Sequence, residues 1–159
     1  RALRAANELT LSIVAEEHGQ VVGHVALSPV KITDDNGRKA EGWHGLGPLS
    51  VLPQRQGHGI GSRLMEQALS ELRTMRAPGC VLLGDPAYYA RFGFQAHASL
   101  QLPGVPPGYF MALALHGPVP EGIAHYAMPY RRRLSQREGG GVLIRLLAFD
   151  TGRNALGPV

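Results

Sequence analysis

The sequence predicts an α/β fold built on a mixed, largely antiparallel sheet. Three patterns predict it: two apolar, β-branched segments at 11–16 and 21–28, an amphipathic helix pattern that begins at Ile60, and a wholly apolar run at 80–83 after that helix. The first pattern is typical of a β-hairpin. With a further strand expected directly before the helix, the other two patterns complete the order strand, helix, strand of a βαβ unit with a right-handed crossover.

The hairpin turn is expected at His18-Gly19, between the first two apolar segments. A second turn is expected at 34–37, where Asp-Asp-Asn-Gly gathers residues that favour turns. The next strand is expected near 46–52, directly before the helix.

The helix has the clearest periodicity in the chain, because apolar residues recur every three or four positions and polar residues take the other face. This spacing predicts an amphipathic helix of about four to five turns. We expect it to end at Pro78-Gly79. Its apolar face comprises Ile60, Leu64, Met65, Ala68, Leu69 and Leu72.

The run at 80–83 predicts a strand buried on both faces. Asp85 then stands as an N-cap with proline at the first helical position, and the short helix is expected to stop at Gly93. Residues 97–108 are expected to be a loop because of their proline breaks, and 109–115 a further strand.

Composition narrows the class of protein. The chain has 159 residues, 44% hydrophobic and 18% charged, which indicates one globular domain. No apolar run approaches the ~20 residues of a membrane span, so no membrane partner is expected. The single Cys80 favours a reducing, cytoplasmic location and excludes a cysteine-based zinc site. The seven His are scattered without metal-ligand spacing, so no metal is expected.

The net charge of +4 lies entirely in the tail. Residues 1–130 hold 10 Lys/Arg and 10 Asp/Glu, whereas 131–159 hold six Arg against two acidic residues. A basic face on the folded domain is therefore not supported. The arginine run is more typical of a solvated segment than of a nucleic-acid site, and no nucleic-acid partner is expected.

The segment between the strand and the helix is rich in glycine. In Gln56-Gly57-His58-Gly59-Ile60-Gly61-Ser62, three alternating glycines let the backbone turn sharply and approach a ligand closely. The helix that follows directs its free N–H groups and positive dipole end toward this loop. Arg55 and Arg63 flank it and are expected to add charge, so the segment predicts an anion site.

Two common phosphate motifs do not fit this loop. A Walker loop needs Gly-Lys-Ser/Thr before the helix, and no lysine is present here. The dinucleotide fingerprint fails as well, because counting from Gly59 its last glycine would fall on Leu64.

The segment does resemble the cofactor motif of the GNAT superfamily of N-acetyltransferases, Gln/Arg-x-x-Gly-x-Gly/Ala. Gln56, Gly59 and Gly61 occupy its fixed positions, and the preceding Leu-x-Val-x-Pro at 49–53 matches the strand that introduces it in that family. The resemblance implies the GNAT acyl-CoA N-acyltransferase fold, in which the strands at 46–52 and 80–83 are parallel neighbours that splay apart. The alternative is a tight strand-to-helix turn without a ligand.

The resemblance also implies a role for each part of the segment. The backbone N–H groups of Gln56, Gly57, His58, Gly59, Ile60, Gly61 and Ser62 would hold the pyrophosphate of acetyl-CoA, the implied co-substrate. The strand edge at Leu49 and Val51 would pair with the pantetheine arm as an added β-strand would. A backbone N–H there would polarise the thioester carbonyl.

A second signature follows at 84–94, Gly-Asp-Pro-Ala-Tyr-Tyr-Ala-Arg-Phe-Gly-Phe. It resembles a later GNAT motif, most closely that of a compact bacterial subgroup. Tyr89 stands where the family's general acid stands, four residues before Gly93, and would protonate the departing thiolate. Tyr88 is the fallback, and a purely packing role for Tyr89 is the alternative. No general base is identifiable: His44, Glu41 and His24 are more typical of structural or exposed positions.

The match covers about residues 1–130, interpreted as an N-terminally truncated GNAT domain, with 131–159 as a basic extension of unknown role. The segment 1–4 resembles the end of the family's second helix, and the resemblance implies that a complete domain would carry a strand and most of two helices before it. We therefore expect an exposed sheet edge beside the first strand. The implied reaction is direct attack of a primary amine on acetyl-CoA, with Cys80 a poor nucleophile candidate. A non-catalytic acyl-CoA-binding module or an inactive fragment is the alternative, the acceptor amine is unidentified, and a homodimer stays open.

Overall fold

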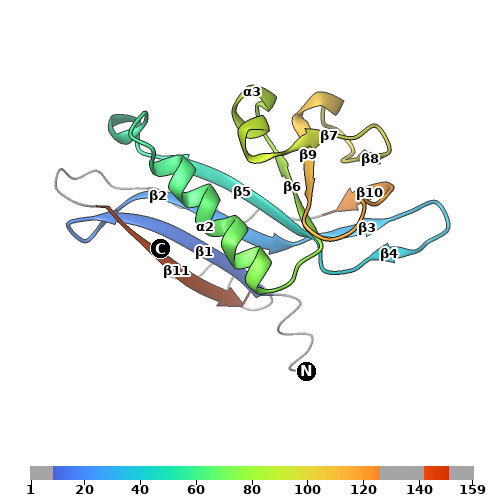
Figure 1. Ribbon diagram of the computed structural model, residues 1–159, viewed down its shortest axis with the longest axis horizontal. Coiled ribbons are helices and arrows are strands. Elements are labelled where there is room, and N and C mark those ends of the chain that lie inside the picture. The colour runs from blue at the N-terminus through green and yellow to red at the C-terminus, as the bar shows by residue number, and fades with distance from the viewer. Residues whose placement is uncertain (1–8, 126–141, 151–159) are drawn as a thin grey trace. The chain divides into compact units, whose positions relative to one another are not determined.

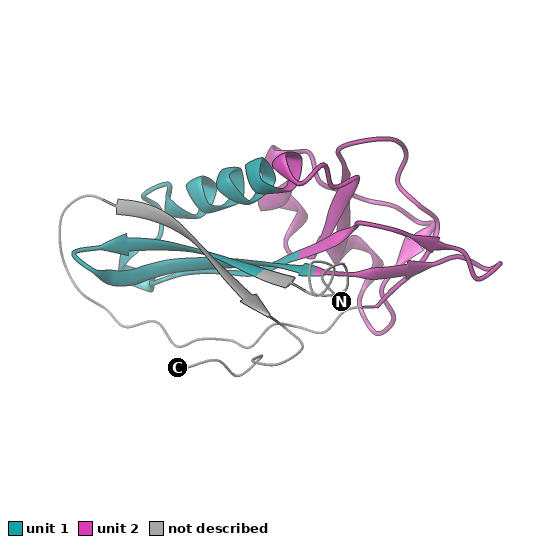
Figure 2. Ribbon diagram, turned by 90° about the horizontal axis from the view of Figure 1, so that it is seen from below, with its two compact units in different colours: residues 1–28, 46–71, 128–159 teal, residues 29–45, 72–127 magenta. Residues whose placement is uncertain are grey.

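The computed structural model describes residues 9–125 and 142–150, with side chains for 11–125. These residues form two compact units, which Figure 2 shows in teal and magenta over residues 11–125. Of the described residues, unit 1 contains 9–28, 46–71 and 142–150, and unit 2 contains 29–45 and 72–125. The resemblance of 1–4 to a helix end and the expected domain boundary at 130 lie outside the described residues.

Unit 1 carries a sheet with the strand order β11-β1-β2-β5. These strands are β11 (Val142–Asp150), β1 (Leu9–Glu17), β2 (Gln20–Pro29) and β5 (His44–Val51). β1 and β2 form the predicted antiparallel hairpin. Its turn residues His18 and Gly19 have φ of 49° and 77°, the left-handed values that a two-residue hairpin turn requires.

The expectation of an exposed edge beside β1 is wrong. β11 pairs antiparallel with β1 along the whole strand, from Leu9 opposite Asp150 to Glu17 opposite Val142. The sequence showed only an apolar run here, and nothing local indicates which strand such a run will pair with. A segment close to the C-terminus therefore occupies the edge of the sheet (Figure 1).

Helix α2 (Ile60–Thr74) lies along one face of this sheet (Figure 1). The predicted apolar face is confirmed, since its members are between 0% and 5% exposed. Gly23 of β2 permits close packing: a Cβ there would meet Leu64 Cδ1 at 3.0 Å and Ile60 Cγ2 at 3.1 Å. The first turn of α2 is thereby held directly against the strand.

The helix ends earlier than predicted. Arg76 has a φ of 59°, its N–H bonds the Arg73 carbonyl, and the Ala77 N–H bonds the Leu72 carbonyl. This pair of hydrogen bonds is a Schellman motif, which stops a helix at a left-handed residue. Pro78-Gly79 therefore follows the helix end rather than causing it.

Unit 2 continues from the start of β5 with the order β5-β6-β9-β7. Its strands are β6 (Gly79–Leu83), β9 (Phe110–Ala114) and β7 (Gln95–Ala96). The predicted parallel pairing is confirmed, with His44 opposite Cys80 and Gly45 opposite Val81. The predicted splaying of these strands stays a prediction.

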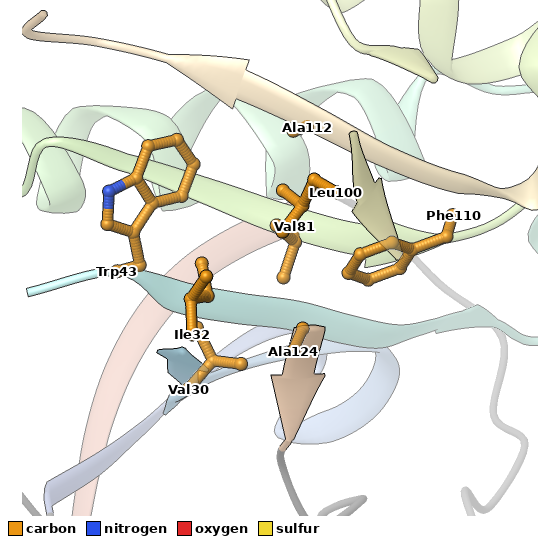
Figure 3. Close-up of a cluster of buried hydrophobic side chains, with 8 residues drawn as sticks. All are labelled: Val30, Ile32, Trp43, Val81, Leu100, Phe110, Ala112 and Ala124. Carbon is orange, nitrogen blue, oxygen red and sulfur yellow. The ribbon is translucent and has the colours of Figure 1, made fainter. Parts of the chain in front are cut away.

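A second, smaller sheet in unit 2 has the order β4-β3-β10-β8. It contains β4 (Lys39–Ala40), β3 (Lys31–Thr33), β10 (Gly122–His125) and β8 (Leu100–Gln101). The loop predicted at 97–108 contains one short strand that was not predicted, because β8 lies within it and pairs parallel with β10. Figure 3 shows the apolar cluster of this unit, formed by Val30, Ile32, Trp43, Val81, Leu100, Phe110, Ala112 and Ala124.

The remaining helical elements are short. They are η1 (Pro53–Arg55), α3 (Pro86–Tyr89), η2 (Ala90–Phe92) and η3 (Pro107–Tyr109). The predicted cap is confirmed, since the Asp85 carboxylate accepts a hydrogen bond from the Ala87 N–H at 2.9 Å. The predicted stop is confirmed as well, with Gly93 left-handed at φ 96°.

Candidate functional site

The glycine-rich loop connects η1 to α2 within unit 1. Gly57 and Gly59 have φ of 80° and 82°, a left-handed conformation that side-chain-bearing residues rarely adopt. Gly61 lies inside the first turn of α2 and is not among the residues with positive φ. Gly57 and Gly59 therefore supply the sharp turn of the loop, and the close approach of a ligand to the three glycines stays a prediction.

The start of α2 has N–H groups available to a ligand. Its first intrahelical bond runs from the Arg63 N–H to the Gly59 carbonyl at 3.1 Å. The N–H groups of Ile60, Gly61 and Ser62 therefore have no carbonyl within the helix. Gly59 has no side chain to cap them, and the first turn contains no acidic residue. Such a helix end attracts an anion through its free donors and its dipole.

Side chains of the loop hold its backbone in place. Gln56 Nε2 donates to the Val51 carbonyl at 3.0 Å. His58 Nδ1 faces the carbonyl oxygens of Arg55 at 3.2 Å and Gln56 at 3.0 Å, so its proton is on that nitrogen. These bonds link the loop to the end of β5 and to its own first residues.

Arg55 does not add net charge to the loop as expected. Its Nη2 lies 2.7 Å from Glu17 Oε2, at the end of β1. The Glu17 side chain is 0% exposed and that of Arg55 is 28% exposed. The guanidinium is therefore offset by a buried carboxylate. Arg63 is exposed on α2.

The remaining predicted binding residues lie on either side of this loop. Leu49 and Val51 are half-buried on β5, and Ser62 is half-buried in the first turn of α2. His58 is exposed within the loop. These positions agree with a strand that leads into a loop and then into the start of a helix. The pairing of β5 with a pantetheine arm stays a prediction.

Tyr89, in unit 2, is the last residue of α3 and is half-buried. Its ring makes edge contacts with Tyr88 at 4.8 Å and Phe94 at 6.4 Å between centroids. A Cβ at Gly84 would overlap its ring, with Tyr89 Cδ2 at 2.6 Å and Cζ at 3.2 Å. Glycine at position 84 therefore makes space for this aromatic side chain.

Burial raises the pKa of the Tyr89 hydroxyl above its ordinary value of 10.0, and the nearby Tyr88 adds to the shift. The group therefore stays protonated at neutral pH, with a proton to donate. Tyr88 instead packs beneath Arg91, whose guanidinium carbon lies 4.5 Å from the ring centroid. This contact gives Tyr88 a separate packing role.

The three base candidates differ in their surroundings. Burial lowers the pKa of His44 below 6.5, only partly offset by a hydrogen bond from Nδ1 to the Gly42 carbonyl at 2.9 Å. The ring is therefore neutral at pH 7, with its lone pair on Nε2. His24 is buried and bonds Ser12 Oγ at 3.1 Å, and Glu41 is exposed. His24 thus has the structural position expected of it.

Cys80 lies buried in β6, and burial raises the pKa of its thiol to about 12. It is a poor nucleophile, because the thiolate is the reactive form. Over residues 9–125 and 142–150, no three His, Cys, Asp or Glu side chains cluster as metal ligands do. Within the same residues, no helix has the length and apolar character needed to span a membrane.

Sequence reasoning missed Glu17, Gly23 and Gly84. Glu17 had no local signal that separates it from Glu16, the carboxylate next to it. Gly23 had none, and Gly84 was only the first residue of the signature at 84–94, with no role of its own. The packing role of both comes from Leu64 and Tyr89, which pack against them in three dimensions.

Comparison with known families gives a match over residues 8–96, to the family model described as an acetyltransferase (GNAT) domain. A curated relative from Escherichia coli, the uncharacterised N-acetyltransferase YhbS, is 37% identical over 115 residues. That alignment covers 72% of this chain and 66% of the relative, so the chain spans just under two thirds of its length.

Two solved structures are similar as well. A GNAT family acetyltransferase from Brucella melitensis in complex with acetyl-CoA is 52% identical, with a TM-score of 0.62 over 79% of this chain and 71% of that one. YhbS from Escherichia coli in complex with CoA is 36% identical, with a TM-score of 0.65 over 79% and 72%.

Proposed function

The chain belongs to the GNAT acetyltransferase family, and we propose that it transfers the acetyl group of acetyl-CoA to a primary amine. The observation that carries this proposal is the uncapped start of α2 behind two left-handed glycines. This arrangement suits a diphosphate, and similar structures are described in complex with acetyl-CoA and CoA.

In this proposal the free N–H groups of Ile60, Gly61 and Ser62, with those of the loop before them, bind the diphosphate oxygens. The fit is supported by the absence of a capping side chain and of first-turn carboxylates, which would compete for those donors or repel an anion. The β5 edge at Leu49 and Val51 is proposed to align the pantetheine arm.

The proposed reaction is a direct transfer. The amine nitrogen forms a bond to the thioester carbonyl carbon, the carbon–sulfur bond breaks, and the sulfur takes up a proton as the amine loses one. We assign the proton donor as Tyr89, whose burial keeps the hydroxyl protonated. The raised thiol pKa of Cys80 argues against a covalent acyl-enzyme through that residue.

The proposal is tested first by titrating the purified chain with acetyl-CoA in a calorimeter, then screening primary amines for thiol release. We expect saturable binding and amine-dependent release of coenzyme A. Absence of binding at millimolar acetyl-CoA to folded protein would overturn the proposal.

Replacing Tyr89 with Phe tests the assignment of Tyr89 as the proton donor. We expect kcat to fall by about 10²-fold, since a positioned acid contributes ~10²–10⁴-fold, while the Kd for acetyl-CoA is unchanged. In the unmodified chain, loss of the Tyr89 proton should reduce kcat at alkaline pH, and at a higher pH than for a tyrosine of ordinary pKa, because burial raises the pKa of Tyr89. The variant should lack this decline. Equal kcat in both proteins would remove Tyr89 from the mechanism.

A further inference from the structure

Glu17 forms an ion pair with Arg55. Among the described side chains, Glu17 is the one carboxylate that is buried. Glu17 Oε2 and Arg55 Nη2 are 2.7 Å apart. Glu17 Oε1 and Arg55 Nε are buried without a hydrogen-bond partner. A buried pair that is incompletely satisfied contributes little to stability compared with an apolar pair, so stability alone does not account for it.

The pair joins two segments that are far apart in sequence. Glu17 ends β1 immediately before the hairpin turn, and Arg55 ends η1 immediately before the glycine-rich loop. The Arg55 carbonyl in turn faces His58 Nδ1 at 3.2 Å. A continuous series of contacts therefore runs from the end of β1, through Arg55, to the middle of the loop.

We propose that Glu17 is a positioning residue which, through Arg55, holds loop 56–59 in the conformation that receives the diphosphate. The inference rests on the proposed function. It assigns Arg55 to the support of the loop rather than to direct contact with the anion, because its Nε is buried and its Nη2 is engaged by Glu17. A loop that is held in its binding conformation loses less conformational entropy when the ligand binds than a mobile loop does.

Arg55 could either contact the anion directly or support the loop, and Glu17→Gln distinguishes these two roles. They predict different changes in the affinity for coenzyme A. If Arg55 contacts the anion directly, loss of the neighbouring carboxylate frees its charge, and coenzyme A binds equally well or more tightly. If Arg55 supports the loop, coenzyme A binds at least about tenfold more weakly, because a charge-assisted hydrogen bond is lost. Isothermal titration calorimetry with coenzyme A, well below the melting temperature of each variant, measures the difference.

Glu66→Gln is the matched control. It makes the same change of charge within unit 1, at an exposed position of α2. Its Kd for coenzyme A should equal that of the unmodified chain.

A second variant separates positioning from simple stabilisation, and it does so even if Glu17→Gln does not fold. Glu17→Leu combined with Arg55→Met replaces the pair by apolar side chains, a change that is often neutral or stabilising. We expect a melting temperature near that of the unmodified chain, with affinity for coenzyme A still reduced at least about tenfold. Recovery of both properties would show that the pair is only structural and would overturn the inference.

The unmodified chain distinguishes this inference from the proposed function. If it binds no coenzyme A, the proposed function fails and the inference fails with it. If it binds coenzyme A and Glu17→Gln binds equally well, only the positioning role is wrong.

Discussion

Gly84 determines where the ring of Tyr89 can lie. Any Cβ at position 84 would overlap that ring, at 2.6 Å from Cδ2 and closer still to Cε2. The ring is also confined by Tyr88 and Phe94. The hydroxyl proposed as the acid therefore owes its position to the absence of a side chain five residues earlier.

Gly84→Ala should lower kcat for acetyl transfer by about ten- to a hundredfold, because a displacement of about 1 Å in a reacting group has effects of that size. The Kd for acetyl-CoA should stay unchanged. Steady-state kinetics and calorimetry on the same preparation measure both quantities.

Gly108→Ala is the matched control, since a Cβ at Gly108 has no atom within 4 Å and Gly108 has no positive φ. It should match the unmodified chain in both measurements. An unchanged kcat in Gly84→Ala would show that the Tyr89 ring moves without consequence, and would weaken its assignment as the acid.

At the residue scale, the sequence correctly predicted the features that depend on a short motif. The sharp turn at the glycine-rich loop, the Asp85 cap and the buried Cys80 follow from local residue types. The neutralisation of Arg55 by Glu17 could not be predicted, because the two residues are 38 positions apart and meet only through the fold.

At the scale of elements, periodic patterns were reliable and short strands were not. The face of α2 was predicted correctly from its long periodic pattern. The parallel pairing of β5 with β6 was predicted correctly from the order strand, helix, strand and from the family resemblance. β4, β7 and β8 are two residues each, too short to show alternation. Their strand geometry comes from neighbouring strands rather than from their own residues.

The end of α2 offers a test at this scale. Arg76 is the left-handed residue of the Schellman motif. The backbone of a residue with a side chain is strained in this conformation, whereas that of glycine is not. Arg76→Gly should raise the free energy of unfolding by about 1 kcal/mol. Urea unfolding followed by circular dichroism measures this change.

Arg73→Gly provides the comparison, because position 73 lies within α2. It should lower the free energy of unfolding by about 1 kcal/mol. Two variants that lose stability equally would mean that the left-handed conformation at position 76 is not strained.

At the scale of the whole molecule, β11 protects the edge of the sheet. It covers the outer edge of β1 over nine residue pairs, although 16 residues at 126–141 separate it from the end of β10. An uncovered edge of that length presents unpaired N–H and carbonyl groups to other chains. The C-terminal segment therefore completes the sheet that carries the glycine-rich loop.

Deleting residues 142–159 should expose β1 and promote association between copies. We expect light scattering after size exclusion to give a larger mass than for the full chain, increasing with protein concentration. Deleting only 151–159 leaves β11 in place and should leave the mass unchanged. The segment 142–159 contains two Arg and one Asp, so its loss changes the net charge by only one unit, and altered charge repulsion would not account for the association. If both truncated chains matched the full chain in mass at every concentration, β11 would have no part in protecting this edge.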